Sequence, residues 1–255
     1  EVSADRPWVV KAFIAGDESA PSAVSFAEQA LWHLHSIWPV GELSTRTLDE
    51  TDWANAWKSH YHPIRIGRHT LICPRWHDVD SSADDVVIRL DPGMAFGTGL
   101  HPTTQLCLEA IEELDLRGCS VLDLGCGSGV LAISAALHGA RCVRALDLDP
   151  IAVRTTRDNA ADNGVGDRVV SLQGSLPADP AVTYDLVLAN IIARVIVDLA
   201  PHLRAATAPE GVLVASGIIA ERLDEVEVAL HVAGFSTEAR QRGDWYALVC
   251  RRSGS

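Results

Sequence analysis

The sequence predicts an α/β protein in which helices cover both faces of a mostly parallel sheet. From Val86 onward, short apolar runs alternate with longer amphipathic segments, a pattern typical of strand–helix units. The predicted strands are almost continuously apolar, as expected for strands that are buried on both faces. Only a tight turn near Gly243 separates the last two strands, so the sheet should end in an antiparallel hairpin.

A smaller mixed α/β unit should precede this sheet. Its expected elements are a strand at 8–14, a helix at about 22–37, a strand at 42–47, a helix from 52 to about 60, and short strands at 64–66 and 70–73. The polar segment 77–85 then suggests a boundary. We therefore expect an N-terminal substrate-recognition domain at 1–60, an interdomain region at 61–85 and a large domain at 86–255.

The large domain should contain seven strands and at least five helices. The predicted strands are 120–124, 142–146, 169–172, 186–189, 212–216, 236–240 and 245–250. The predicted helices are about 103–115, 129–138, 150–162, 194–206 and 219–232.

Composition narrows the classes of function. No run of about 18 apolar residues suggests a membrane span. A formal net charge of −13 disfavours nonspecific nucleic-acid binding and fits a basic protein partner better. The six cysteines form no C-x-x-C pair, so we interpret them as buried reduced thiols in a cytoplasmic protein rather than as disulfides or zinc ligands.

A glycine-rich turn follows the first strand of the large domain. Gly125, Gly127 and Gly129 form a G-x-G-x-G turn that opens a helix, which suits a ligand lying against backbone. This turn is shared by nicotinamide, flavin and S-adenosylmethionine binders. Asp123 lies inside the strand, where a buried carboxylate would find a partner in the charged amino group of S-adenosylmethionine.

Two further polar residues follow strands of the same sheet. Asp147 comes twenty-two residues after Gly125, a distance that suits a carboxylate binding ribose hydroxyls. Asp149, just before Pro150, should cap the next helix. Asn190 ends the strand at 186–189 and is expected either to face the ligand at this edge or to cap a helix.

The segment FGTGLHPTT at 96–104 carries another glycine cluster, with two glycines, and leads into a helix. The hydroxyl of Thr103 or Thr104 could cap that helix or hold an anion, such as the carboxylate of a methionine moiety. Phe96 would either cover a cofactor or pack within the protein. His101 would be a ligand contact or part of the loop structure, and not a base.

Four motifs together resemble the ribosomal protein L11 methyltransferase family, and the resemblance extends from about Asp52 to the C-terminus. They are PGMAFGTGLHPTT, VLDLGCGSGVLAI, ALDLDP and LVLANI. The resemblance implies a Rossmann-like, seven-stranded class I methyltransferase domain. A small α+β ferredoxin-like domain, of which this chain would hold a truncated form, should precede it.

The resemblance also implies a reaction. S-adenosylmethionine would be the methyl donor, with S-adenosylhomocysteine as the product, and lysine or N-terminal amines of the ribosomal protein would be methylated. The family's cofactor contacts fall on Thr104, Gly125, Asp147 and Asn190. We expect Asn190 to be catalytic as well, because its side-chain carbonyl could orient the attacking amine.

Other functions compete with this interpretation. Methylation of another protein lysine and cofactor binding without catalysis are the main alternatives. A nicotinamide-dependent oxidoreductase is opposed by Asp123 and by the spacing of the glycines. Amide and adenine methyltransferases usually carry Asn-Pro-Pro-Tyr, whereas this chain has Asn-Ile-Ile-Ala at 190–193.

Overall fold

The computed structural model describes residues 20–35, 41, 43–45, 62–90, 99–176 and 182–253. The chain divides into two compact units, Glu1–His60 and Tyr61–Ser255. In the first unit, α1 (Ala20–His35) confirms the helix predicted at 22–37. Residues 43–45 form no strand, so the strand predicted at 42–47 is wrong there. The strand predicted at 8–14 and the helix at 52–60 lie outside the described residues.

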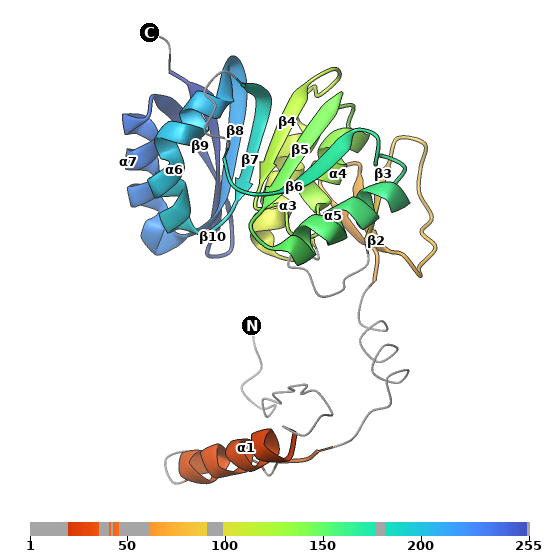
Figure 1. Cartoon of the computed structure of the whole chain (residues 1–255), viewed down its shortest axis with the longest axis vertical. Coiled ribbons are helices and arrows are strands. Elements are labelled where there is room, and N and C mark those ends of the chain that lie inside the picture. The colour runs from red at the N-terminus through yellow and green to blue at the C-terminus, as the bar shows by residue number, and fades with distance from the viewer. Residues whose placement is uncertain are drawn as a thin grey trace. The chain divides into compact units, whose positions relative to one another are not determined.

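The second unit contains the predicted seven-stranded sheet, with the order β6-β5-β4-β7-β8-β10-β9 (Figure 1). Its strands are β4 (Ser120–Leu124), β5 (Cys142–Asp147), β6 (Val169–Gln173), β7 (Tyr184–Asn190), β8 (Thr207–Ile219), β9 (Phe235–Arg242) and β10 (Trp245–Arg252). The strands from β6 to β8 in this order are all paired in parallel. The final strand, β10, is antiparallel to both of its neighbours, β8 and β9, which confirms the predicted hairpin.

Helices cover both faces of this sheet. One face carries α3 (Pro102–Glu112), α4 (Val130–Leu137) and α5 (Pro150–Asp162), and the other carries α6 (Ala193–Ala206) and α7 (Leu223–Val232). A short 3-10 helix, η1 (Ala220–Arg222), precedes α7. Each face has its own apolar core, because alternate side chains of a strand point to opposite faces.

A second, three-stranded sheet consists of β1 (Ile64–Ile66), β2 (Thr70–Pro74) and β3 (Val86–Leu90). Its buried residues Ile66, Ile72, Ile88 and Leu90 belong to the same apolar core as α3 and α4. Residues 62–85 therefore do not form the separate interdomain region that we expected. They pack with the large domain, because β2 pairs with β3 along its whole length.

The cysteines are unpaired, as predicted. Cys73, Cys107, Cys126 and Cys250 are buried, and burial raises the pKa of the Cys107 thiol to about 12. Cys142 is exposed, so the expectation of burial is wrong for this residue. Within the described residues, we find no helix with the length and apolar character needed to cross a membrane.

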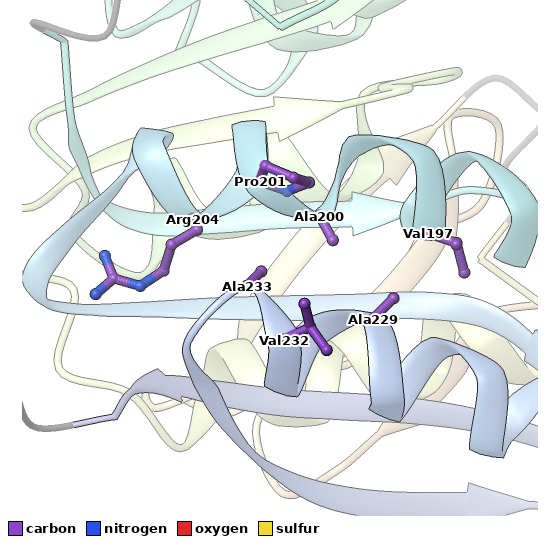
Figure 2. A pocket seen from close by; sticks show the side chains of 7 residues that line it. All are labelled: Val197, Ala200, Pro201, Arg204, Ala229, Val232 and Ala233. Atoms are coloured by element: carbon purple, nitrogen blue, oxygen red, sulfur yellow. The ribbon is translucent and has the colours of Figure 1, made fainter.

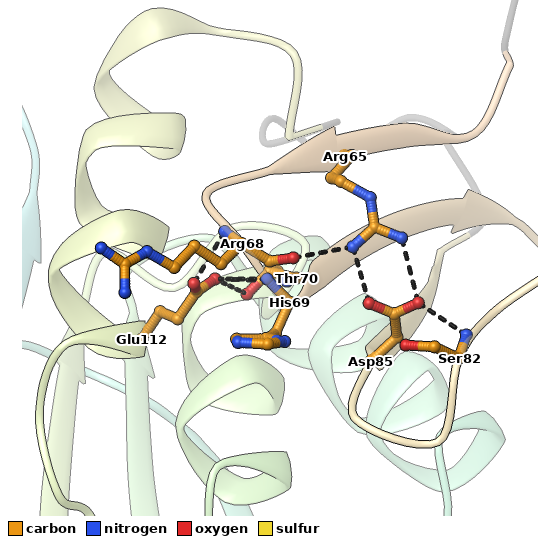
Figure 3. A network of polar contacts seen from close by, with 7 residues as sticks. All are labelled: Arg65, Arg68, His69, Thr70, Ser82, Asp85 and Glu112. Atoms are coloured by element: carbon orange, nitrogen blue, oxygen red, sulfur yellow. Dashed lines mark hydrogen bonds and ion pairs between the residues drawn. The ribbon is translucent and has the colours of Figure 1, made fainter.

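Polar side chains fasten the small sheet (Figure 3). Glu112, at the end of α3, accepts hydrogen bonds from the amides of Arg68, His69 and Thr70 and from the hydroxyl of Thr70, at 2.7 to 3.2 Å. Burial raises the pKa of Glu112, but these four hydrogen bonds outweigh it and leave the pKa below its usual value. The carboxylate thus ties the β1–β2 turn to α3.

An ion pair lies at the same end of the small sheet, where β3 begins beside the β1–β2 turn. Arg65 on β1 binds both carboxylate oxygens of Asp85, at 2.6 and 3.0 Å, and the amide of Ser82 donates to the same carboxylate at 2.7 Å. The hydrogen bonds from Arg65 and Ser82 hold the pKa of Asp85 well below its usual range. The polar segment before β3 is therefore tied back to β1.

We predict that Glu112→Gln destabilises the protein at pH 7 by about 1 kcal/mol, because an amide NH₂ would face backbone donors, while solvent screens the partly exposed site. The lowered pKa of Glu112 stabilises the folded state above the unfolded pKa of about 4.3, and this stabilisation is lost as the pH falls through the folded pKa. The difference from wild type should therefore shrink below about pH 4. Urea unfolding between pH 3 and pH 7 measures it.

Glu113→Gln is the matched control, because Glu113 forms an exposed ion pair with Arg240. It should change stability by less than about 0.5 kcal/mol. Equal losses in the two variants at pH 7 would contradict the role of Glu112.

Candidate cofactor site

Strand register brings three of the predicted site residues to one edge of the sheet. Leu124, the last residue of β4, is paired with Leu146 on β5 and with Ala189 on β7. The next residue of each strand is Gly125, Asp147 and Asn190, respectively. Because neighbouring strands are about 4.8 Å apart, these residues form a row about 10 Å long at the carboxyl ends of the strands.

The glycine turn has the backbone that only glycine adopts readily. Gly125, Gly127 and Gly129 have φ values of 74°, 55° and 82°. A Cβ atom would meet the Ile191 side chain at 2.5 Å if added to Gly125, and the Thr156 side chain at 2.8 Å if added to Gly129. At these two positions, packing within the protein already requires glycine. These two glycines are therefore no evidence for a ligand by themselves, although a ligand lying close to the turn would be a further reason for glycine.

Asp147 contacts the glycine turn directly. Its Oδ2 accepts a hydrogen bond from the amide of Gly127 at 2.9 Å, and its Oδ1 accepts one from the amide of Asp149 at 3.0 Å. Each carboxylate oxygen has a second lone pair for a further donor. Asp149 caps α5 by accepting a hydrogen bond from the amide of Ile151 at 2.8 Å, as predicted. The two aspartates therefore have different structural roles.

Asp123 is a buried carboxylate with one unpaired oxygen. It is 1% exposed, and its Oδ2 accepts a hydrogen bond from the amide of Ala132 at 3.1 Å. Its Oδ1 has no partner among the residues that the structure describes. Burial raises the pKa of Asp123 to about 7, the Ala132 amide lowers it, and the charge of Asp147 raises it further. An orphaned acceptor of this kind is suited to a cationic or hydrogen-bond-donating ligand group.

The N-terminus of α3 meets the same edge. Thr103 and Thr104 are each 3% exposed, and Nδ2 of Asn190 donates to Oγ1 of Thr104 at 3.2 Å. This hydrogen bond joins the segment that precedes α3 to the end of β7.

His101, rather than a threonine, caps α3. Its Nδ1 accepts a hydrogen bond from the amide of Thr103 at 3.4 Å and lies 2.7 Å from the hydroxyl oxygen of Thr103. Its ring meets Trp245 edge to face, with ring centroids 4.6 Å apart. Nothing in the local sequence pointed to Trp245, since about 140 positions separate it from His101. Phe96 lies outside the described residues, and its predicted role remains a prediction.

A separate hollow of about 450 Å³ lies between α6 and α7 (Figure 2). It is lined mainly by apolar side chains, and Arg204 lies at one end, near the ring of Phe235. None of the predicted site residues lines this hollow. We therefore place the candidate site at the strand ends and not here.

Comparisons with known proteins give a consistent result. Residues 1–253 match the family model described as "Ribosomal protein L11 methyltransferase (PrmA)". A protein with that name from Herpetosiphon aurantiacus is 43% identical, and the match covers 99% of this chain and 85% of that protein. A second protein of that name, from Chloroflexus aurantiacus, is 45% identical, and the match covers 97% of this chain and 83% of that protein.

A solved structure agrees with these matches. The crystal structure of a ribosomal protein L11 methylase from Lactobacillus delbrueckii subsp. bulgaricus superposes with a TM-score of 0.71 at 37% sequence identity. The superposition covers 76% of this chain and 100% of that one.

We predict that Asp123 makes stability depend on pH. Because the pKa of Asp123 is higher in the folded state, its protonated carboxyl group stabilises the folded state relative to the unfolded state. This contribution is complete below the unfolded pKa of about 3.9 and is lost as the pH rises toward the folded value of about 7. Asp123→Asn should remove this loss. The stability of the variant relative to wild type should then increase by on the order of 1 kcal/mol per pH unit between pH 5 and pH 7. Urea unfolding of the ligand-free protein measures this difference, and a constant difference would contradict the assignment.

Proposed function

The chain belongs to the ribosomal protein L11 methyltransferase family, and from this we propose that it methylates amino groups of ribosomal protein L11 with S-adenosylmethionine as donor. One structural observation supports assigning the reaction to particular residues. The hydrogen bond between Asn190 and Thr104 joins the PGMAFGTGLHPTT and LVLANI motifs at the edge where Gly125 and Asp147 also lie.

The residues at this edge fit the chemical groups of the donor. Asp147 would accept hydrogen bonds from ribose hydroxyls, and the glycine turn at 125–129 would lie against the adenosyl part. Thr103 and Thr104, at the positive end of α3, would hold the carboxylate of the methionine part. The unpaired Oδ1 of Asp123 would accept a hydrogen bond from its amino group, directly or through water. When bound, S-adenosylmethionine supplies an electrophilic methyl group.

Asn190 would orient the attacking amine. Its Nδ2 is engaged by Thr104, which fixes the plane of the amide and leaves Oδ1 to accept a hydrogen bond from the amine. With the hydrogens of the amine held, its lone pair would point at the methyl group. No step of this arrangement requires a catalytic base if the amine loses its proton to water before it binds.

A neutral acceptor suits this reaction better than a carboxylate. A free lysine has a pKa of about 10.4, so removing its proton at pH 7 costs roughly 4 to 5 kcal/mol. A carboxylate beside the amine would stabilise the cation and increase this cost. An asparagine carbonyl can orient the amine while stabilising its cation less, because the carbonyl carries no full charge.

The overall charge of the chain supports a basic protein as the partner. With a formal net charge of −13, the chain would attract a lysine-containing ribosomal protein and repel nucleic acid. Its six unpaired cysteines fit a reducing compartment, so we place the reaction in the cytoplasm. Recognition of the substrate by residues 1–60 also belongs to this proposal.

We predict that Asn190→Ala lowers kcat about 100-fold, because the amine is no longer oriented, a loss within the range known for misplaced reactants. Affinity for S-adenosylhomocysteine should change by no more than about fivefold, since the other donor contacts remain. Single-turnover kinetics and calorimetry measure the two quantities separately. Normal turnover in this variant would remove Asn190 from the mechanism.

We predict that radiolabelled methyl groups enter ribosomal protein L11 when the enzyme is incubated with unmethylated ribosomal proteins. Mass mapping should locate the label on lysine side chains or on the N-terminal amine. Label on another protein would overturn the substrate assignment, and label mainly in RNA would also overturn the reaction class. Tight cofactor binding without any transfer would indicate a regulatory module instead.

A further inference from the structure

The β9–β10 hairpin contacts one face of α3. Arg242 forms an ion pair with Glu109 at 2.6 Å, and Arg240 forms one with Glu113 at 2.7 Å. These two glutamates lie one helical turn apart, and Gln105 comes one turn earlier on the same face. The contacts of the hairpin therefore extend along α3 toward its N-terminus, where the candidate site lies.

Arg242 is also linked to the loop that leads into α3. Its Nη1 donates to Oε1 of Gln105 at 2.9 Å, and Nε2 of Gln105 donates to the carbonyl oxygen of Leu100 at 2.9 Å. Within the described part of the chain, Arg240 instead pairs with Glu113 and Glu238 and makes no link to this loop. The two arginines thus make similar ion pairs but differ in their connection to the loop.

Trp245 contacts the same loop at the following residue. Its ring meets the imidazole of His101 at an interplanar angle of 72°, and His101 is the residue that caps α3. Trp245 and Arg242 are paired across the hairpin, so both contacts come from the same place in the sheet. Together they fix two consecutive residues, Leu100 and His101.

The loop has a particular need for such support. Gly99 has a φ of 80°, and glycine in a loop allows many backbone conformations when nothing restrains it. If the loop is not already ordered in the free protein, the ligand must order it on binding, and the conformational entropy lost in this step weakens the affinity. Support from the hairpin would therefore act on the affinity of the adjacent site.

We propose that Arg242 and Trp245 are positioning residues that hold residues 99–102 and the N-terminus of α3 ready for the donor. Neither residue is proposed to touch the donor or the amine. The ligand assigned here rests on the proposed function, whereas the mechanical link between hairpin and loop can be tested without any ligand.

The sharpest test compares Arg242→Ala with Arg240→Ala. Both variants remove one hairpin arginine and one ion pair with α3, but only the first breaks the link to Leu100. Hydrogen exchange of the amides at 99–105 should become faster in Arg242→Ala and stay near wild type in Arg240→Ala. Affinity for S-adenosylhomocysteine should weaken about fivefold in Arg242→Ala and by less than about twofold in Arg240→Ala.

Trp245 gives an independent arm of the same test. Trp245→Ala should behave like Arg242→Ala, and Trp245→Phe, which keeps an aromatic ring for His101, should restore most of the affinity. In Arg242→Ala and Trp245→Ala, the KM for S-adenosylmethionine should rise while kcat at saturating donor stays near wild type. A purely structural role would instead lower the melting temperature of Arg242→Ala and Arg240→Ala alike, without separating KM from kcat.

Two outcomes would overturn different statements. Equal exchange rates at 99–105 in Arg242→Ala and Arg240→Ala would overturn the inference, whatever the ligand results. A wild-type protein that binds neither S-adenosylmethionine nor S-adenosylhomocysteine would overturn the proposed function, while the exchange data would still decide whether the hairpin holds the loop.

Discussion

The register of β4 between β5 and β7 is the constraint on which the candidate site depends. Pairing of Leu124 with Leu146 and Ala189 aligns Gly125, Asp147 and Asn190 at the same edge. A slip of one residue between these strands would turn every side chain of the shifted strand to the other face. The apolar cores on both faces of the sheet exclude such a slip, so packing far from the edge determines where the polar residues lie.

At Asp123, burial within the domain is energetically unfavourable. A carboxyl group that is 1% exposed with one unpaired oxygen destabilises the ligand-free fold, whereas an apolar residue of similar size would not. Natural sequences tolerate such conflicts mainly at functional sites. The same residue would thus lower the stability of the free protein and contribute to ligand binding.

Local sequence patterns predicted the elements that depend on near neighbours. The bounds of β4 and the cap at Asp149 agree with the structure, because an apolar strand followed by a glycine turn and an Asp-Pro pair are local signals. The segment 77–85 was interpreted as part of an interdomain region because it is polar. One of its polar residues, Asp85, has a structural role instead, since it pairs with Arg65, twenty residues earlier.

Contacts between distant parts of the chain could not be predicted in this way. The capping of α3 by His101 depends on loop geometry, and the support of His101 by Trp245 depends on a hairpin about 140 residues away. The sequence separately indicated Asn190 and Thr104 as site residues. Only the folded chain shows that they bind one another.

The position of β10 between β8 and β9 also affects how the enzyme is assembled during translation. Trp245 and Arg242 are synthesised after every other residue described at the site. Domains begin to fold while the ribosome is still adding residues. The support that the hairpin gives to α3 can therefore form only once the hairpin has emerged and β10 has inserted into the sheet. A nascent chain would thus not have a fully braced donor site until this last step of folding.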